Sequence, residues 1–451
     1  MGPWRAPFVR ALASLGLLLL AGSAWAQPSA LRGLPGGVSA GGDITVFEAP
    51  AVDPAQERLE DERRMARGQV PHFAAALSVS VDPWRHGGWQ PEGRTQARWR
   101  LRIESKGALS LSLAFGRFDL PAGARLEILP SSGGGGFGPF TADDRDSHGQ
   151  LWTPPVTGDA LDLQLTVPVA GLDAVELELV RIHHGYAGFG EDPLQKAGSC
   201  HRDLACGDSE WRDAGRSVGL MTVEGVRFCT GFLVNNTAQD RRPLFLTALH
   251  CGVSKVNAAS TVVMWNHQLP SCSADEKPPE TTRAFQTGAS LLAADTATDV
   301  VLLELDDPPD PAHGVAWAGW DRSEDDPRTC ASIHHPNTGA KRLAIDYGPA
   351  RTTAHLGDEE VAGGDHLRVG AWEIGSTEGG SSGAPLLNED RRVVGWLRGG
   401  YAACGVRRAD WFGRLSAAWH GPSDRRRLRD WLDPLDTQVL VLDPLDGPTV
   451  D

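Results

Sequence analysis

All seven cysteines of this 451-residue chain lie after residue 199, and the first 199 residues have none. Such an abrupt change in cysteine usage marks a domain boundary. A chain of this length also exceeds the usual size of one domain, so we expect two domains with a sizeable core in each. Because seven is an odd number, at least one cysteine is left without a partner. The seven are Cys200, Cys206, Cys229, Cys251, Cys272, Cys330 and Cys404.

The first 26 residues have the three-part pattern of a secretory signal peptide. Arg5 and Arg10 give a basic start, residues 11–22 form a short apolar core, and Ala24-Trp25-Ala26 is a small-residue cleavage site. The apolar run is too short to span a bilayer, and no later segment approaches its length. We therefore expect a secreted protein, periplasmic or extracellular, with no membrane contact after removal of residues 1–26. The alternative, a buried N-terminal helix, explains the pattern less well. Because an exported protein enters an oxidising compartment, we expect disulfides among its cysteines.

The net charge of −15 comes from 43 Lys and Arg against 58 Asp and Glu. Because no basic excess is available to neutralise phosphates, we do not expect nucleic acid as a partner. The adjacent His183 and His184 have no further ligands at usable spacing, so the sequence indicates structural histidines rather than a metal site. No metal and no cofactor are expected.

Apolar and polar residues alternate with a period of two in the cysteine-free part of the chain. Gly, Pro and Asp turns separate the alternating segments, which predicts an antiparallel β-sandwich over about residues 75–190. Residues 27–75 are rich in Gly, Pro and Ala, and "ERLEDERRMARG" within them predicts one exposed helix or a linker. The predicted strands are Ala97–Ser105, Leu109–Phe118, Ala124–Pro130, Leu161–Pro168 and Ala174–Gly185.

Three residues in the second part of the chain stand in contexts that suit catalysis. His250 directly follows the β-rich apolar run Leu244–Leu249, so its ring is expected where a strand ends. Asp299 directly precedes the apolar run Val300–Leu303, and Ser382 lies in "GGSSGAP". The order His, Asp, Ser is the order of the chymotrypsin triad among several unrelated triad arrangements.

These residue types match the chemistry of acyl transfer. A serine hydroxyl is a poor nucleophile until a nearby base takes its proton, and His has a suitable pKa for that near neutrality. A carboxylate on the other ring nitrogen fixes the tautomer and stabilises the imidazolium. The glycine at Gly380 allows its own N–H and that of Ser382 to point together at a developing oxyanion. Each residue alone is weak support, because a Ser-Gly turn is usually a surface loop.

Several strings of the second part, in this order, resemble the lysyl endopeptidases, secreted bacterial members of the chymotrypsin-like serine peptidases. They are "TGFLVNNTAQDRRPLFLTALHCG", "TDVVLLEL", "WAGWDR", "IHHPN", "GGSSGAP" and "DWLDP", within residues 198–436. The resemblance implies an all-β chain with a chymotrypsin-like double antiparallel β-barrel after the β-sandwich, and polypeptides as substrates. It implies His250 as general base, Asp299 as orienting acid and Ser382 as nucleophile. Asp295 is a nearby rival to Asp299, but no strand follows it directly.

The resemblance also implies which cysteines pair. The implied bridges are Cys200 to Cys404, Cys206 to Cys272, and Cys229 to Cys251. That leaves Cys330, whose apolar neighbourhood favours a buried thiol over a reactive one. His334 and His335 could suggest zinc, but the same "IHHPN" in the family is not a metal site and no further ligand is near.

Substrate selection is expected to depend on an acid in a narrow pocket. The place used by trypsin, six residues before the nucleophile, is Ser376, which cannot hold a cation. The family uses an Asp soon after the last cysteine, and "ADWFGR" supplies Asp410, which would pair with Lys or Arg at P1. The family has a His stacked on a Trp beside the pocket. Here "GWLRGG" has Arg398, followed by Gly399, and Arg398 could repel a cationic P1 side chain or pair with Asp410.

The family begins its mature chain a few residues before its first cysteine, which here is close to Lys196 and Ala197. The resemblance therefore implies a zymogen with a pro-segment at residues 27–196, which is an intramolecular partner of a peptidase domain at residues 197–451. Ser381 stands where chymotrypsin-like enzymes activated by a freed N-terminus carry an Asp that binds it. An alternative is a secreted binding or adhesion protein with an inactive peptidase-like domain.

Overall fold

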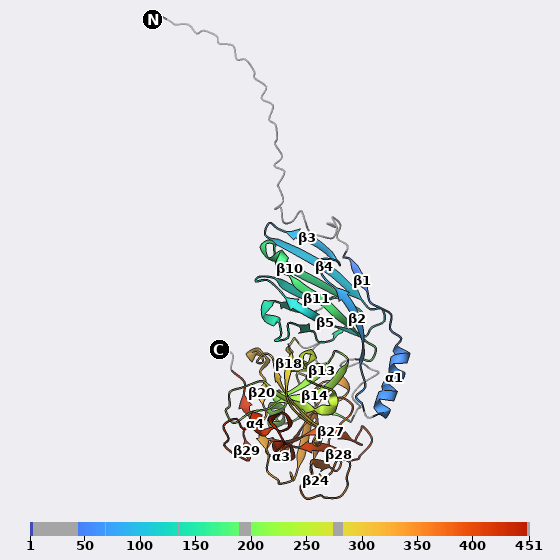
Figure 1. The fold of residues 1–451 in the computed structure, drawn as a ribbon, viewed down its shortest axis with the longest axis vertical. Coiled ribbons are helices and arrows are strands. Elements are labelled where there is room, and N and C mark those ends of the chain that lie inside the picture. Colours follow the sequence, from blue (N-terminus) through green and yellow to red (C-terminus); the bar gives the residue numbers. More distant parts are fainter. Residues whose placement is uncertain (3–43, 68, 134, 189–199, 274–282, 449–451) are drawn as a thin grey trace.

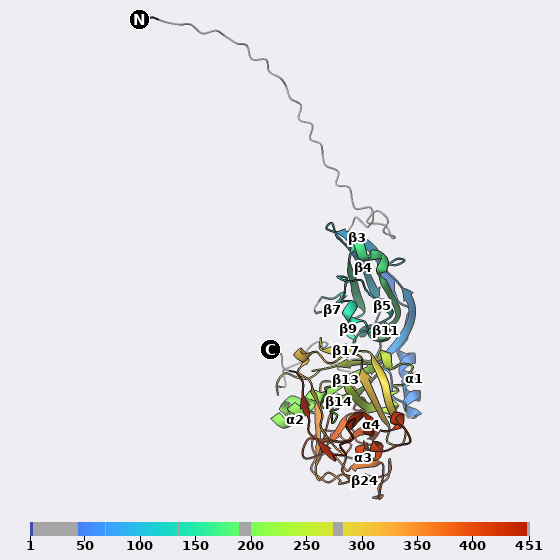
Figure 2. The ribbon, with the colours of Figure 1, turned by 60° about the vertical axis from the view of Figure 1, so that its left-hand side comes forward.

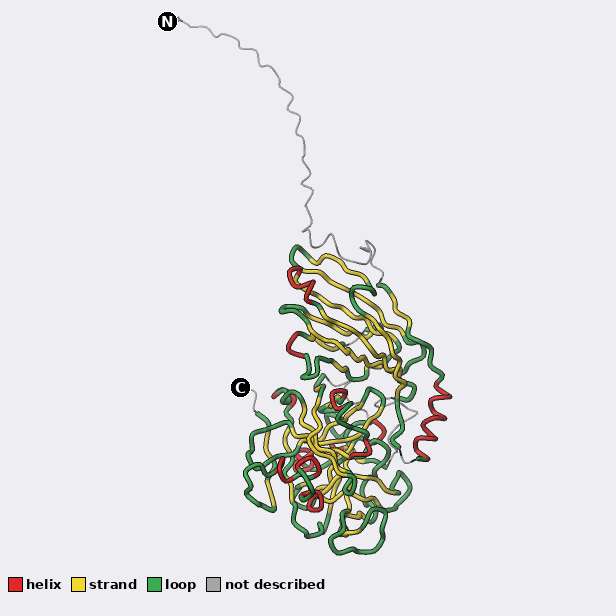
Figure 3. Tube along the Cα trace, viewed as in Figure 1, coloured by secondary structure: helices red, strands yellow, loops and turns green. Residues whose placement is uncertain are grey.

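The computed structural model describes residues 1–2, 44–67, 69–133, 135–188, 200–273 and 283–448. Strands make up most of its regular structure, and they gather into two bodies that follow one another along the sequence (Figures 1 and 3). Nearly all of the predicted signal peptide, from residue 3 onward, lies outside the described residues, as do Lys196 and Ala197. None of the described residues belongs to a helix with the length and apolar character needed to cross a bilayer.

The first body is built from two sheets around one core. One sheet has the strand order β1-β4-β10-β6-β7 with β3 on β4, and the other has the order β2-β11-β5-β8 with β9 on β5. Their pairs are antiparallel except β1 with β4. The strands are β1 (Val46–Glu48), β2 (Ala74–Val81), β3 (Gly88–Glu92), β4 (Gln96–Glu104), β5 (Ser110–Asp119), β6 (Arg125–Pro130), β7 (Phe137–Phe140), β8 (Leu151–Trp152), β9 (Val156–Thr157), β10 (Ala160–Pro168) and β11 (Glu176–Gly185).

The five predicted strands are confirmed as β4, β5, β6, β10 and β11 to within two residues at each end. Strand β4 shows why the alternation was informative, since every second side chain is buried along its length. The segment for which the sequence allowed either a helix or a linker forms the helix α1 (Pro54–Ala66). Asp53 begins this helix, because its side chain accepts hydrogen bonds from the N–H groups of Ala55 and Gln56.

The second body contains two larger sheets. The first has seven antiparallel strands in the order β17-β16-β13-β14-β15-β19-β18. It consists of β13 (Val218–Val223), β14 (Arg227–Leu233), β15 (Leu244–Ala248), β16 (Val262–Met264), β17 (Phe285–Thr287), β18 (Ala289–Asp295) and β19 (Val300–Leu305).

The other sheet of this body has ten strands, with the main order β12-β23-β22-β26-β27-β28-β25-β24. Its strands are β12 (Arg202–Asp203), β21 (Trp320–Asp321), β22 (Cys330–His334), β23 (Arg342–Asp346), β24 (Arg351–Thr353), β25 (His366–Val369), β26 (Pro385–Leu387), β27 (Val393–Gly400), β28 (Asp410–Arg414) and β29 (Val441–Leu442). Beside these sheets lie the short pair β20 (Ala316–Trp317) and β30 (Leu445–Asp446), and the short helices α2 (Ser209–Ala214), α3 (Leu415–Trp419) and α4 (Arg429–Leu432). The two large sheets give the all-β, double-barrel architecture of the chymotrypsin-like type.

One apolar cluster joins the two large sheets. It takes Phe232 and Leu246 from the seven-stranded sheet and Ile333 and Trp396 from the ten-stranded sheet, all fully buried. Since apolar burial is the main favourable term in folding, this cluster fixes how the sheets sit on each other. Three disulfides add covalent links at Cys200–Cys404, Cys206–Cys272 and Cys229–Cys251, which are the pairs implied by the family resemblance.

The two bodies are in direct contact (Figure 2). Phe285 of the second body packs edge-on against Phe137 and Phe140 of the first, with ring centroids 5.3 and 6.2 Å apart. Phe73, just before β2, packs against Phe228 of β14 at 6.1 Å, and its N–H donates to the carbonyl of Val226 at 2.9 Å. Aromatic packing and main-chain hydrogen bonding therefore both cross the boundary.

The unpaired thiol of Cys330 gives a first prediction. Cys330 is buried on β22, and burial raises the pKa of its thiol, so it should stay protonated and unreactive in the folded protein. We expect a thiol reagent such as Ellman's reagent to find no reactive thiol in the native protein and one per chain after unfolding without reductant. Peptide mapping by mass spectrometry should place the modification on Cys330. A bridge containing Cys330 would contradict the pairing.

Candidate active site

His250 lies at the end of strand β15, in the 3₁₀ turn Leu249–Cys251. Gly252 ends this turn in the left-handed region (φ 83°), where glycine is favoured. Cys251 is bonded to Cys229 on the neighbouring strand β14, so a covalent link fixes the backbone directly beside the imidazole. The predicted place of His250 at a strand end agrees with the structure.

Asp299 lies immediately before β19, which pairs with β15. It is buried and has a positive φ of 58°, an uncommon backbone conformation for a residue other than glycine. Its Oδ2 accepts a hydrogen bond from Nδ1 of His250 at 2.6 Å, and its Oδ1 accepts one from the N–H of His250 at 3.0 Å. The carboxylate thus fixes both the ring and the backbone of the histidine.

Ser382 comes from the other sheet and completes the constellation. The hydroxyl of Ser382 donates to Nε2 of His250 at 2.7 Å. Because the carboxylate of Asp299 requires a hydrogen on Nδ1, Nε2 is left as the acceptor in a neutral ring. Three residues separated by up to 132 positions therefore form one hydrogen-bonded chain in which a proton can move from Ser382 to His250.

The backbone conformation of the loop before Ser382 is tightly constrained. Gly380 has a φ of 86°, and a Cβ at this position would collide with the ring of Phe228. The hydroxyl of Thr230 donates to the carbonyl of Gly380 at 2.9 Å, and the N–H of Thr230 donates to the carbonyl of Ser382, also at 2.9 Å. Among the described residues, the N–H groups of Gly380 and Ser382 make no hydrogen bond, so both remain available to an incoming oxygen.

A pocket of about 460 Å³ opens directly beside the serine. Ser382 and Asp410 both line it, and Gly399 lies on its wall. Glycines along one wall leave room for a long side chain to enter. The remaining lining residues are Asn337, Thr377, Glu378, Gly379, Leu397, Gly400, Ala402 and Ala403.

Asp410 is the first residue of β28 and is 1% exposed. Its Oδ2 accepts hydrogen bonds from Nε1 of Trp372 at 2.8 Å and from the hydroxyl of Thr377 at 2.5 Å, and its Oδ1 accepts one from the N–H of Ala402 at 3.3 Å. Burial raises the pKa of Asp410, while the bonds from Thr377 and Trp372 oppose that shift. Among the described residues no cation is paired with this carboxyl, so a cation entering the pocket would meet a desolvated partner.

Glu378 is a site residue that the sequence analysis missed. It lines the same pocket, four positions before Ser382. Its Oε2 accepts from Nδ2 of Asn337 at 3.0 Å and is 3.1 Å from Nε2 of His201, while its Oε1 accepts from the N–H of Cys404 at 3.4 Å. The available signal was the acid within "EGGSSG", but a carboxylate in a loop is usually solvated, and only the packing shows that this one faces the pocket.

The other proposed substrate-binding residues lie differently from what their positions suggested. Ser376 is buried and is not among the residues that line the pocket, and its hydroxyl donates to the carbonyl of its neighbour Thr377 at 3.3 Å. Arg398 is the extra residue of a β-bulge in β27, and its guanidinium donates to the carbonyl of Ala297 at 3.1 Å and to Nε2 of His366 at 3.2 Å. The anticipated pairing of Arg398 with Asp410 does not occur among these contacts.

Asp295, the rival to Asp299, lies at the end of β18 and accepts hydrogen bonds from Arg426. The adjacent His183 and His184 of β11 are buried, and their rings bond Ser112 and Ser105. Only one group of potential metal ligands occurs among the described residues, Cys200 with His201 and Cys404, and its two sulfurs are consumed by a disulfide.

Comparison with known proteins identifies relatives of this chain. The family model described as "Lysyl endopeptidase, C-terminal domain" matches residues 194–413. A lysyl endopeptidase of Pseudomonas aeruginosa is 30% identical over 360 residues, which cover 73% of this chain and 74% of that protein.

Solved structures also align with part of this chain. A variant of human heparin binding protein aligns with 56% of this chain and 100% of its own at 16% identity and a TM-score of 0.36. A thermostable serine protease from an extremophilic microorganism aligns with 44% of this chain and 91% of its own at 12% identity and a TM-score of 0.32. Both scores are below 0.5, so the family rests on the sequence relative. This chain belongs to the lysyl endopeptidase family and is a serine endopeptidase that acts on polypeptides.

Proposed function

We propose that Ser382, His250 and Asp299 form the catalytic triad of this peptidase. The observation that carries the proposal is the continuous pair of short hydrogen bonds, 2.7 Å from Ser382 to His250 and 2.6 Å from His250 to Asp299. A nucleophile, a base within hydrogen-bond reach and a group that orients the base are the parts that acyl transfer needs.

In the proposed reaction, Oγ of Ser382 attacks the carbonyl carbon of the scissile bond while its proton passes to Nε2 of His250. The former carbonyl oxygen becomes an oxyanion, which accepts hydrogen bonds from the N–H groups of Gly380 and Ser382. His250 then gives the proton to the leaving amine as the C–N bond breaks, which leaves an acyl-enzyme. A water molecule attacks the ester, passes one proton to His250, and releases the acid as Ser382 recovers its hydrogen.

We propose lysine as the P1 residue, with arginine as the alternative. Two carboxylates, Asp410 and Glu378, line a pocket next to the nucleophile, and a cationic side chain entering it would pair with acceptors that are already oriented. Arg398, which could have neutralised Asp410, is directed toward Ala297 and His366 instead. A compact ammonium fits a site in which Asp410 already accepts three hydrogen bonds.

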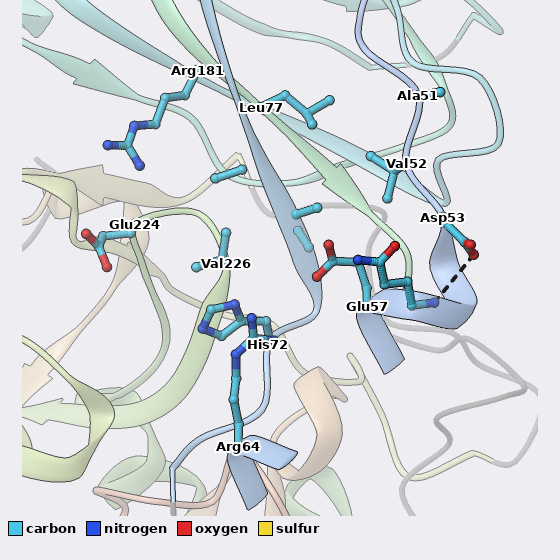
Figure 4. A pocket seen from close by; sticks show the side chains of 14 residues that line it. Ala51, Val52, Asp53, Glu57, Arg64, His72, Leu77, Arg181, Glu224 and Val226 are labelled. Carbon is cyan, nitrogen blue, oxygen red and sulfur yellow. Dashed lines mark hydrogen bonds between the residues drawn. The ribbon is translucent and has the colours of Figure 1, made fainter. Parts of the chain in front are cut away.

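We propose that the chain is secreted as a zymogen and that residues 27–196 are its pro-segment. The aromatic contacts of Phe73 with Phe228 and of Phe285 with Phe137, which join the sandwich to the other body, support this proposal. A pocket of about 490 Å³ lies at this boundary. It is lined by residues of α1 and β2 and, from the other body, by Glu224 and Val226 (Figure 4). Three disulfides suit an oxidising compartment outside the cytoplasm.

The triad gives a prediction for single substitutions. Ser382→Ala should lower kcat for a peptide amide by about 10⁶, leaving only the catalysis of binding and oxyanion stabilisation. A sulfonyl fluoride should label the wild-type protein at Ser382, and the label can be located by mass spectrometry. A variant that kept a tenth of the wild-type rate would contradict the assignment of the nucleophile.

Two aspartates close together in sequence provide a matched control. Asp299→Asn should lower kcat by about 10⁴, because the histidine tautomer is no longer fixed. Asp295→Asn removes the same charge from the surface contact with Arg426 and should leave kcat unchanged. Equal losses in both variants would remove Asp299 from its proposed role.

The pocket gives a prediction for selectivity and its pH dependence. Asp410→Asn should lower kcat/KM for lysine substrates by about 10² or more, because an entering cation would lose its buried partner. Since burial raises the pKa of Asp410, the free carboxyl becomes neutral on acidification sooner than an exposed Asp would. KM for P1 lysine peptides should therefore rise as the pH falls through that raised pKa, and this rise should be absent in Asp410→Asn. P1-varied peptides measured against pH provide the test, and an unaltered lysine preference in Asp410→Asn would reject the proposal.

The pro-segment gives a prediction for maturation. We expect cleavage after Lys196, so that the mature chain starts at Ala197, and we expect the enzyme itself to make the cut. Ser382→Ala should then accumulate as the full precursor in a protease-deficient host, and Lys196→Arg should mature more slowly if the pocket prefers lysine. N-terminal sequencing of the secreted protein is the measurement. Cleavage of purified Ser382→Ala after Lys196 would exclude self-processing, and a mature N-terminus elsewhere would exclude the site.

A further inference from the structure

Two buried histidines that take no part in the triad lie directly behind the nucleophile loop. His334, at the end of β22, is fully buried, and a 2.7 Å hydrogen bond joins its Nδ1 to Oγ of Ser381. This bond is the one hydrogen bond that the ring of His334 makes among the described residues, because its Nε2 has no partner there. His201 packs edge-on against His334 at 5.7 Å and reaches Glu378 through its Nε2.

These two histidines act on opposite ends of one short segment, Glu378–Ser382. The hydroxyl of Ser381 also accepts a hydrogen bond from the N–H of Glu378 at 3.1 Å, and the N–H of Ser381 donates to the carbonyl of Glu378 at 3.1 Å. The side chain of Ser381 therefore closes the turn on itself and ties it to His334. Gly380, whose N–H must face the substrate, lies inside this closed turn.

The residue before the nucleophile is uncharged and fully buried. Since a serine hydroxyl offers no charge to a free α-amino group, Ser381 cannot form an ion pair with a new N-terminus. The chain at the start of the described peptidase body is instead held by the disulfide Cys200–Cys404 and by the contact of His201 with Glu378. The turn is thus held by the contacts of Ser381 with His334 and of Glu378 with His201, none of which involves a newly formed chain end.

We propose that His334, acting through Ser381, is the positioning residue that holds the loop in its oxyanion-binding shape, so that the peptidase needs no charged N-terminus to assemble this part of its site. The inference rests on the proposed roles of Ser382 and Gly380. Burial keeps His334 neutral, since it holds the pKa of the ring well below its ordinary value, and a neutral ring can retain the bond to Ser381 throughout the working pH range.

The test compares substitutions that remove or keep this hydrogen bond. Ser381→Ala and His334→Leu should lower kcat by about tenfold to a hundredfold, somewhat less than the 10²–10³ of losing one oxyanion donor outright. The affinity for a peptidyl-lysine aldehyde, whose hemiacetal oxygen occupies the oxyanion position, should fall by the same factor. His334→Asn, which retains a polar group near the position of Nδ1, should recover most of the loss. All rates are to be normalised to the concentration of titrated active sites.

A matched control separates positioning from stability. His267 is also a fully buried histidine, but its ring bonds the carbonyl of Thr338 rather than the nucleophile loop. His267→Leu should lower the melting temperature while leaving kcat and aldehyde affinity per active site unchanged. If Ser381→Ala and His334→Leu behaved in the same way as His267→Leu, the proposed role of His334 would be refuted.

A second measurement does not depend on any variant folding. Chemical acetylation of the α-amino group of the mature wild-type enzyme should leave kcat unchanged, because no ion pair is needed to order the loop. Loss of activity on acetylation would overturn the proposal. Sulfonyl fluoride labelling of Ser382 in the same wild-type sample reports on the nucleophile itself, so failure of the proposed function can be distinguished from failure of this inference.

Discussion

The packing of the seven-stranded sheet on the ten-stranded sheet is the constraint on which the active site depends. Of the proposed site residues, His250 and Asp299 lie beside strand ends of the first sheet, whereas Ser382 lies in the loop before β26 and Asp410 begins β28 of the second. Neither sheet alone therefore contains the proposed site. The shared apolar cluster sets their relative position, and Thr230 makes it specific by bonding the carbonyls of both Gly380 and Ser382 across the junction. A hydrogen bond of 2.7 Å tolerates little displacement, so the contact between Ser382 and His250 depends on close packing of the apolar residues at this junction.

Burial shifts the pKa of a histidine and the pKa of an aspartate near the proposed site in opposite directions. It disfavours the charged form, so it keeps His334 neutral behind the loop and raises the pKa of Asp410 in the pocket. For His334 the neutral state suits a permanent hydrogen bond. For Asp410, under the proposed lysine specificity, the same cost would be offset when a substrate cation arrives, and the pocket would then select for charge rather than for bulk alone.

Much of the fold and the centre of the site could be predicted from the sequence, because the signals were local. Alternation gave β4 and β10 to within a residue, and the apolar runs beside His250 and Asp299 located both residues at strand ends. The remaining features depend on contacts between distant segments. The direction of the Arg398 side chain follows from a β-bulge, and Glu378 lines the pocket from a loop. No periodic pattern in the sequence predicts either feature. The bond from His334 to Ser381 likewise links residues 47 positions apart, and the sequence showed only an ambiguous histidine pair.

The bridge Cys200–Cys404 has a mechanical consequence. It joins residues 204 positions apart, so most of the peptidase body lies within one covalent loop. A chain end created upstream of Cys200 cannot peel away strand by strand, because tension applied there passes through the sulfur atoms to Cys404 and from it to the segment that precedes β28. Strand β12, the weakly paired edge next to that end, is thereby shielded from load. An exopeptidase or an unfoldase that grips this end would have to extract the loop as a whole.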